Sequence, residues 1–181
     1  SASSIASACM DAGMGQTESC TLSVEMGRFI ASSCGYYITS ICDIKHSADT
    51  DWVIVDGGIN HVNYYGQMMG MKVPHVLQMR EGKPVGGSVP EDGRSSTPTE
   101  GDDALSCCIC GSLCTTNDIL IRSLGLNDPK IGDVLVFANV GAYSVTEAMG
   151  LFLSRTMPRI ISFRDGHTEL VRDHVETWKI N

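Results

Sequence analysis

The chain has 181 residues, a hydrophobic share of 43%, a charged share of 19% and a formal net charge of -8. This length and composition predict one folded domain, or a domain with an appendage, that buries a core. The acidic balance and the lack of any run of five basic residues exclude nucleic acid and an anionic membrane surface as default partners, because both are bound through Lys and Arg.

The first residues, SASSIASACMDAGMG, lack the positive start and the long apolar run of a signal peptide. Apolar runs elsewhere are short pieces such as DVLVFANV, well below the roughly 20 residues of a membrane-spanning helix. We therefore expect a cytoplasmic protein. Its eight cysteines should then stay reduced, most of them as small buried hydrophobes.

The first half of the chain predicts several strands. Residues 1–20, rich in Ser, Ala, Gly and Met, predict a weak helix or a frayed terminus. From residue 21 to 46, β-branched and aromatic residues form strand-like runs that are broken by Gly27 and Gly35. Residues 52–55 then predict a buried strand that ends in an Asp-Gly-Gly turn.

A long exposed loop is predicted for residues 83–103, which are rich in Gly, Pro, Ser and acidic residues. The stretch NDILIRSLGL after it has apolar spacing that favours a helical turn. DPKIGDVLVFANVGAY then predicts a turn, a strand and a Gly-Ala-Tyr corner.

The last part of the chain predicts a short helix and a hairpin. Ser144 and Glu147 have the spacing of a capping box at the start of SVTEAMGLFLSR. Asp165 and Gly166 predict a tight turn between two strands. Strands outnumber helices, so the predicted fold is mainly β.

The stretch VEMGRF holds an acid, a flexible glycine and an arginine, Glu25, Gly27 and Arg28. The planar guanidinium of an arginine suits a phosphate or a carboxylate, because it binds two oxygens at once. By itself the stretch fits equally a surface charge pair that flanks a turn.

Two other stretches allow a functional and a structural interpretation. VDGGINH places Asp56 and His61 around a glycine pair that permits close backbone approach, and it also fits a hairpin turn. In GAYS, Tyr143 stands at a predicted helix start, where anions are favoured, and it also fits a buried ring with a local hydrogen bond.

The stretch CCICGSLCTTND holds four of the cysteines, Cys107, Cys108, Cys110 and Cys114. Cys107 and Cys110 form a C-x-x-C pair, but no second pair follows at zinc-ribbon spacing, and the flanks lack a thioredoxin-like context. The spacing therefore predicts no metal site. On the incoming strand, alternation should bury some of the first three thiols.

The order VEMGRF, VDGGIN, CGSLCTTNDIL, GDVLVFANVGAYS resembles the C-terminal half of the fold-type III pyridoxal-phosphate decarboxylases, which act on diaminopimelate, ornithine and arginine. The resemblance covers about residues 20 to 181. It implies a β-barrel or sandwich domain of the alanine racemase-like and ornithine decarboxylase type, with a few short helices. Members carry an N-terminal α/β barrel, largely absent here, that supplies the lysine holding the cofactor. Residues 1–28 would be the remnant of that barrel, and 29–181 the β-domain.

The resemblance also assigns cofactor contacts. Glu25 matches the acid that hydrogen-bonds the pyridine nitrogen of pyridoxal 5'-phosphate, which helps the ring to draw off electrons. Gly27 and Arg28 match the glycine and arginine near the phosphate, and Tyr143 matches the tyrosine that contacts the phosphate. Met26 stands where the family usually has Pro.

Cys114 matches the cysteine that one subunit inserts into its neighbour's active site, where it assists protonation at the correct carbon. Substrate contacts would fall on Arg28, Thr115 and Tyr64. Family members often have an acid at the position of Thr115. Diaminopimelate decarboxylases also have an Arg and a Tyr just after the Asp-Gly strand, where the nearest residues here are Tyr64 and Met68. Neither the diacid pocket nor the diamine-precursor pocket is therefore reproduced.

The resemblance implies a carboxy-lyase that acts on an amino acid, free or on a carrier, as a homodimer with shared active sites. The chain alone, without the barrel lysine, is expected to be inactive and to expose apolar surface. Two alternatives stay open: a non-catalytic truncated paralogue that binds or regulates an intact decarboxylase, and a zinc-binding β module. Retention of Glu25, Arg28, Cys114 and Tyr143 weighs against a non-catalytic copy.

Overall fold

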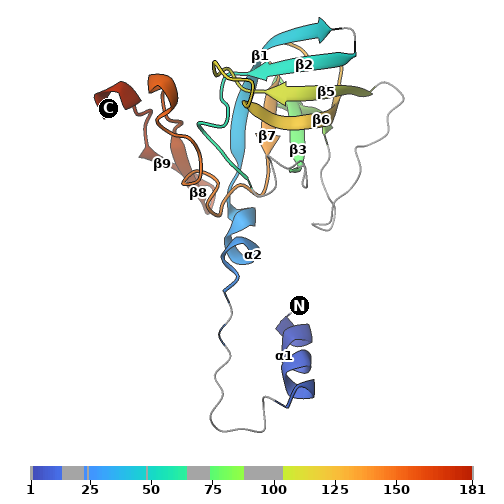
Figure 1. Ribbon diagram of the computed structural model, residues 1–181, viewed down its shortest axis with the longest axis vertical. Helices are drawn as coiled ribbons and strands as arrows, with labels where there is room; N and C mark the ends of the chain where they lie inside the picture. Colours follow the sequence, from blue (N-terminus) through green and yellow to red (C-terminus); the bar gives the residue numbers. More distant parts are fainter. Residues whose placement is uncertain are drawn as a thin grey trace.

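The computed structural model describes residues 2–13, 23, 25–47, 49–64, 74–87 and 104–180, and a seven-stranded sheet forms their centre. The strands run in the order β4-β3-β7-β1-β2-β5-β6 (Figure 1). They are β1 (Tyr37–Ser47), β2 (Thr50–Val55), β3 (Val76–Arg80), β4 (Lys83–Gly87), β5 (Ala104–Cys110), β6 (Ile119–Asn127) and β7 (Val134–Phe137). Neighbours pair antiparallel except β2 and β5, which are parallel.

The two edges of this sheet approach each other, which makes it resemble a barrel. The side-chain amide of Asn127 on β6 donates a 3.0 Å hydrogen bond to the carbonyl of Val85 on β4. Inward-facing aliphatic and aromatic side chains fill the space between the strands. They include Ile41, Val53, Val55, Val76, Ile109, Leu120, Leu126, Leu135 and Phe137. Each such side chain stabilises the fold by about 1.5–3 kcal/mol when it is fully buried.

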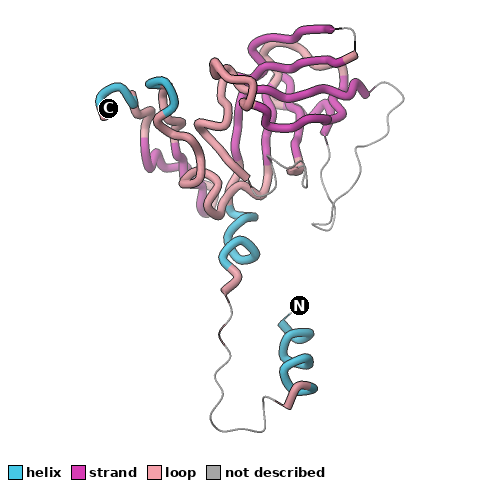
Figure 2. Tube along the Cα trace, in the orientation of Figure 1, coloured by secondary structure: helices cyan, strands magenta, loops and turns pink. Residues whose placement is uncertain are grey.

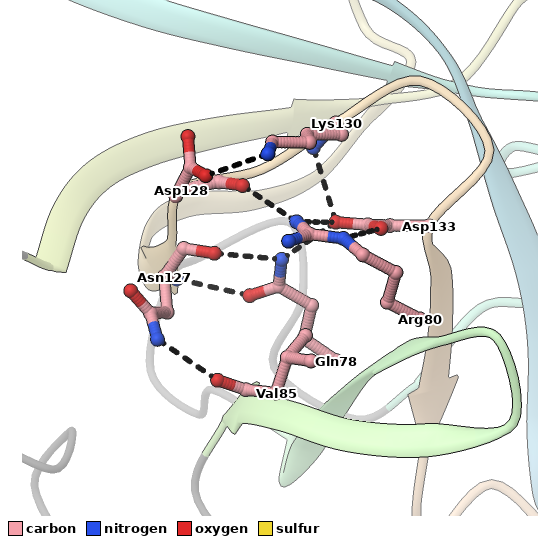
Figure 3. A network of polar contacts seen from close by, with 7 residues as sticks. All are labelled: Gln78, Arg80, Val85, Asn127, Asp128, Lys130 and Asp133. Atoms are coloured by element: carbon pink, nitrogen blue, oxygen red, sulfur yellow. Dashed lines mark hydrogen bonds and ion pairs between the residues drawn. The ribbon is translucent and has the colours of Figure 1, made fainter.

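A polar network holds the strand edges together near β3 (Figure 3). Buried Gln78 donates to the carboxylate of Asp133 at 2.8 Å and to the carbonyl of Asn127 at 3.0 Å, and it accepts from the Asn127 amide at 2.9 Å. Arg80 grips the same carboxylate with Nε at 2.7 Å and Nη2 at 2.8 Å. This arrangement satisfies the buried amide and carboxylate, which would otherwise destabilise the core.

A separate two-stranded hairpin lies beside the sheet, at the left in Figure 1. It consists of β8 (Ile160–Arg164) and β9 (His167–Arg172). Asp165 and Gly166 connect them with φ values of 51° and 81°, the left-handed pair that a two-residue hairpin turn requires. The buried hydroxyl of Thr177 donates to the carbonyl of Arg155 at 2.9 Å and ties the end of the chain to the start of this segment.

In the described parts of the chain, helical segments are few and short (Figure 2). They are α1 (Ala2–Asp11), α2 (Gly27–Ala31) and the 3-10 turns η2 (Ser32–Cys34), η3 (Phe152–Ser154) and η4 (Thr177–Lys179). Among the described residues, no helix has the length and apolar character needed to cross a membrane.

The fold confirms the predicted mainly β class. The buried strand at residues 52–55, the strand in GDVLVF and the hairpin around Asp165 and Gly166 are all present. The proposed division between residues 28 and 29 stays a prediction.

Four local predictions were wrong. The strand-like run expected between Gly27 and Gly35 forms α2 and η2, where the chain packs against residues 141–143. The stretch NDILIRSLGL forms β6 rather than a helical turn, because it pairs antiparallel with β5. Lys83–Gly87 forms β4 rather than the start of a loop, and residues 88–103 lie outside the described residues. Ser144 caps no helix, because its hydroxyl contacts the Ala142 carbonyl at 3.4 Å and turns follow it.

Candidate functional site

Arg28 and Tyr143 meet where α2 lies against the corner that follows β7. The guanidinium carbon of Arg28 stands 5.0 Å from the centroid of the Tyr143 ring, a cation–π distance. Arg28 Nη1 also donates to the carbonyl of Ala142 at 3.4 Å. Arg28 thus contacts both the ring and the backbone of the Gly-Ala-Tyr corner, although Ala142 lies 114 residues further along the chain.

Glu147 completes this cluster. Arg28 Nη2 donates to both carboxylate oxygens of Glu147 at 2.9 Å. The Glu147 amide donates to the Tyr143 carbonyl at 2.8 Å, so a tight turn carries the acid back beside the ring. Tyr143 itself has a φ of 64°, in the left-handed region that non-glycine residues seldom adopt. The turn therefore fixes the ring and the acid together around Arg28.

Glycines allow α2 to approach this corner closely. A Cβ at Gly27 would clash with the Tyr143 hydroxyl, and a Cβ at Gly35 would clash with the backbone of Gly141. A Cβ at Gly141 would in turn clash with the carbonyl of Ala31. The missing side chains leave room for the Tyr143 hydroxyl to lie directly over the start of α2.

These groups suit an anionic ligand. A guanidinium and a phenolic hydroxyl are both donors, and Arg binds phosphate with particular geometric fit. Arg28 and Tyr143 keep a third and a half of their surface exposed, so an anion can reach them. Glu25 is exposed and lies two residues before Gly27, beside the same cluster along the chain. The donor set therefore fits a phosphate group.

Cys114 lies in a second place, the connection between β5 and β6, where its thiol is exposed. Buried Asp118 organises this connection by accepting hydrogen bonds from the backbone amides of Ile59 and Leu113, both at 2.8 Å. A Cβ at Gly58 or Gly111 would clash with the same carboxylate. Asp118 thus clamps the Asp-Gly-Gly turn against the cysteine-bearing connection.

The Asp-Gly-Gly turn has further polar support. Asp56 accepts from the hydroxyl of Thr39 and from the Ser40 amide at 3.0 Å, so its carboxylate holds the turn to β1. A Cβ at Gly57 would clash with the hydroxyl of Tyr37 and with His61. The glycine pair therefore serves close approach of neighbouring polar groups.

His61 connects the turn to the C-terminal segment. Its Nε2 donates to the carbonyl of Thr156 at 2.9 Å, since a carbonyl only accepts, and its Nδ1 accepts from the Tyr37 hydroxyl at 3.2 Å. Burial lowers the pKa of His61 and raises that of Tyr37, which favours the neutral form of both rings. His61 thus has a structural explanation within the described fold.

Two predicted substrate residues, Tyr64 and Thr115, form hydrogen bonds within the chain. Tyr64 is buried, and this burial raises the pKa of its phenol. Its hydroxyl donates to the carbonyl of Leu120 in the core. The Thr115 hydroxyl accepts from the Asn117 amide at 3.3 Å within its own connection. Tyr64 is therefore left out of the site proposed below, whereas half-buried Thr115 keeps its place next to Cys114.

Within one chain the two places are apart. Figure 1 shows α2 below the sheet and the connection between β5 and β6 at the upper side, next to the end of β2. The structure thus groups Gly27, Arg28 and Tyr143, and it does not bring Cys114 to them.

The comparison with protein families decides what this arrangement belongs to. A family model described as the C-terminal sheet domain of pyridoxal-dependent decarboxylases matches residues 28–141. The chain belongs to this decarboxylase family. The match begins at Arg28, in α2, and ends at Gly141, two residues before Tyr143.

Curated relatives of the chain are decarboxylases. It is 27% identical over 161 residues to a diaminopimelate decarboxylase of Buchnera aphidicola, with 83% of this chain and 34% of the relative covered. It is 28% identical over 156 residues to a decarboxylase of an L-glutamyl acyl-carrier protein from Niallia circulans, with 84% and 33% covered. The chain thus spans about a third of the length of the curated relatives it matches.

Solved structures show the same fold. A diaminopimelate decarboxylase from M. jannaschii in complex with L-lysine matches with a TM-score of 0.69 and 24% identity, covering 91% of this chain and 33% of that one. A diaminopimelate decarboxylase from Helicobacter pylori matches with a TM-score of 0.68 and 21% identity, covering 91% and 36%. The sheet of this chain is therefore the sheet domain of the decarboxylase family.

Sequence reasoning missed Glu147 and Asp118 as parts of the site. Glu147 was interpreted as a capping residue, because its partner Arg28 lies 119 residues away. Asp118 is an acid at the end of a turn-rich stretch, which by itself is a weak signal. Its burial against Gly111 gives the residue its importance, and that burial is visible only in the structure.

Proposed function

We propose that this chain forms the sheet-domain side of the active site of a pyridoxal-phosphate-dependent amino-acid decarboxylase. The cluster of Gly27, Arg28 and Tyr143 carries the proposal, because it gathers two phosphate donors over a glycine that leaves space for them. When bound, pyridoxal phosphate supplies an electron-withdrawing ring that stabilises the charge left as carbon dioxide departs.

The residues of this chain would hold and orient that group. Arg28 and the Tyr143 hydroxyl would donate to the phosphate, and Glu147 would keep the guanidinium turned toward Tyr143. Glu25 would accept a hydrogen bond from the pyridine nitrogen, which keeps that nitrogen protonated. The resemblance to the family supports the role of Glu25, and its exposed position next to Gly27 is compatible with it.

We further propose a homodimer with active sites shared between subunits. Cys114 is exposed and lies apart from Arg28 in the same chain, so it would serve the neighbouring subunit's site and move a proton there. Apolar side chains exposed beside Arg28 agree with a surface that other protein parts cover; Phe29 is 76% exposed and Ile30 75%.

The substrate would be an amino acid that places no charged group against the side chain at position 115. Thr115 offers a hydroxyl there rather than a carboxylate. An amino acid presented on a carrier fits this condition, and the similarity to the acyl-carrier-protein decarboxylase supports it.

The test is a decarboxylase assay of this chain joined to the barrel half of a diaminopimelate decarboxylase, with a panel of free and carrier-bound amino acids. We expect carbon dioxide release that requires pyridoxal phosphate and is lost in Arg28→Ala. The same barrel with its own sheet domain is the positive control. A folded joined protein that releases no carbon dioxide from any substrate, while the control does, would contradict the proposal.

A further inference from the structure

Two of the clustered cysteines face each other on the outer side of the sheet. Cys107 and Ile109 point into the core, so the alternation of β5 turns Cys108 and Cys110 to the other side. The sulfur atoms of Cys108 and Cys110 lie 3.9 Å apart. The pair that the structure forms is thus C-x-C, and not the C-x-x-C pair of Cys107 and Cys110.

The pair is sheltered on one side and accessible on the other. On the neighbouring strand, Trp52 pairs with Cys108 and Ile54 pairs with Cys110. Cys108 is 5% exposed, whereas Cys110 is half-buried and lines an open cavity of about 440 Å³ together with Trp52 and Ile54. A ligand in this cavity can therefore reach the thiol of Cys110, and the sulfur of Cys108 lies next to that thiol.

We propose that Cys108 and Cys110 form a dithiol site that chelates a thiophilic atom of low coordination number. Trivalent arsenic is the example of this ligand class. Two metal–thiolate bonds of about 2.3 Å at a tetrahedral angle hold their sulfurs about 3.8 Å apart. A pyramidal trivalent arsenic holds its two sulfurs somewhat closer than a tetrahedral metal does, so the pair at 3.9 Å needs a small side-chain rotation and no movement of the backbone.

The number of ligands selects this class of ligand. Among the described residues, no three His, Cys, Asp or Glu side chains converge on one point, so a four-ligand zinc site lacks partners there. A monosubstituted trivalent arsenical needs only two sulfur ligands, and its own organic substituent takes the third position. The cavity beside Cys110 has room for that substituent.

The chemistry balances without an oxidant. An organic arsenic oxide forms two arsenic–sulfur bonds, both S–H bonds break, and the two protons leave with the oxide oxygen as one water molecule. No atom changes oxidation state. Burial, and after it the neighbouring Cys108, raises the pKa of Cys110, so reagents that attack a single thiolate should react slowly there. A chelator captures both thiols together.

The test uses the full 181-residue chain, reduced and then incubated with phenylarsine oxide, with intact mass as the readout. We expect one adduct per chain that withstands an excess of a monothiol and is removed by a dithiol. Cys108→Ser and Cys110→Ser should each raise the concentration for half-saturation at least tenfold. Cys42→Ser and Cys114→Ser, which remove exposed single thiols, should leave it unchanged.

Two outcomes overturn the proposal. One is a wild-type chain that holds no monothiol-resistant adduct. The other is an adduct that persists in both Cys108→Ser and Cys110→Ser. Near-ultraviolet circular dichroism of each variant reports whether it folds. If the buried substitution Cys108→Ser unfolds the protein, the test uses Cys110→Ser and Cys108→Ala instead. Cys110 is only half-buried, and alanine at position 108 adds no polar group to the buried site.

Discussion

Arg28 Nη2 donates two 2.9 Å hydrogen bonds to Glu147, and the two residues lie 119 positions apart. Their side chains keep 34% and 45% of their surface exposed, so solvent weakens the attraction between the charges. The importance of the pair lies in orientation: it keeps the guanidinium beside the Tyr143 ring. A salt bridge of this kind orients the guanidinium more than it stabilises the fold.

A double-mutant cycle separates these two contributions. Arg28→Ala, Glu147→Ala and the double variant should show a coupling of at most about 1 kcal/mol in the free energy of unfolding, and less at high salt. In the joined enzyme, Glu147→Ala should weaken pyridoxal phosphate binding about tenfold, since an unrestrained guanidinium loses its preorganisation. Urea unfolding and a cofactor titration measure the two effects. Unchanged cofactor affinity in Glu147→Ala would show that Arg28 is held without this acid.

Gly27→Ala tests the close approach of Tyr143. The new Cβ would clash with the hydroxyl at the end of an exposed side chain, so the ring should move and the fold should persist. We expect the melting temperature to change by a few degrees at most. Pyridoxal phosphate affinity should fall about tenfold, because the neutral hydroxyl donor of Tyr143 is displaced. In a Tyr143→Phe background the same substitution should cost much less, because the nearest ring carbon stands 3.2 Å from the new Cβ.

The sheet was predictable where its burial pattern is regular. The short apolar run from Trp52 to Val55 predicts a buried strand, and in β2 the side chains of Val53 and Val55 are buried. In β6 the buried residues Leu120, Ile121 and Leu124 follow a helix-like spacing. Register shifts between β5 and β6 cause it, because an irregular ladder breaks the two-residue period. Local spacing therefore favoured the wrong element.

The site was predictable in its parts and not in its contacts. Motif order predicted Arg28 and Tyr143 as cofactor contacts, and in the structure the two side chains lie together. Glu147 and Asp118 act through partners far away in the chain, and no local pattern encodes such pairs. Burial of Tyr64 likewise depends on Leu120, 56 residues further on. Long-range contacts decide which of several plausible polar residues belong to a site.

Asp133 should make the fold sensitive to acid. Hydrogen bonds from Arg80 and then from Gln78 hold the pKa of Asp133 below its ordinary value of 3.8. A lowered pKa means that the unfolded chain binds the proton more readily. The stabilisation is thus complete above about pH 4 and is lost as the pH falls through the folded-state pKa.

Asp133→Asn should lower the free energy of unfolding at pH 7 by about 1.5–3 kcal/mol, because the buried carboxylate accepts charge-assisted hydrogen bonds. It should also flatten the dependence of stability on pH below about pH 4. Urea unfolding across that range measures both. Asp128→Asn is the matched control, since that side chain is exposed and pairs with Lys130 at the surface. Equal effects of the two substitutions would show that the buried carboxylate of Asp133 contributes no more than the exposed one of Asp128 (Figure 3).

Asp118→Ala should loosen the connection that carries Cys114. The substitution removes the acceptor of two backbone amides, Ile59 and Leu113, and leaves buried donors unpaired at a cost of about 1–3 kcal/mol each. Hydrogen exchange at these two amides should accelerate more than at strand amides of β7. Asp118→Asn, which keeps one carbonyl oxygen, should give an intermediate rate. Exchange that accelerates evenly over the whole sheet would instead indicate global destabilisation.

Cys114 provides the sharpest test of shared active sites. Cys114→Ala in the joined enzyme should slow turnover or misdirect protonation. Alanine at Cys107, Cys108 or Cys110 should change activity little, provided that the protein folds.

If Cys114 serves the neighbouring subunit, Cys114→Ala and Arg28→Ala damage different halves of each site. Equal mixing of the two variants then yields hybrid dimers that contain one intact site. Random exchange makes half of the dimers hybrid, so about a quarter of wild-type activity should return. Mixing two preparations of the same variant is the control and should restore nothing. If a Cys114→Ala and Arg28→Ala mixture whose subunits demonstrably exchange also restores nothing, both groups act within one chain.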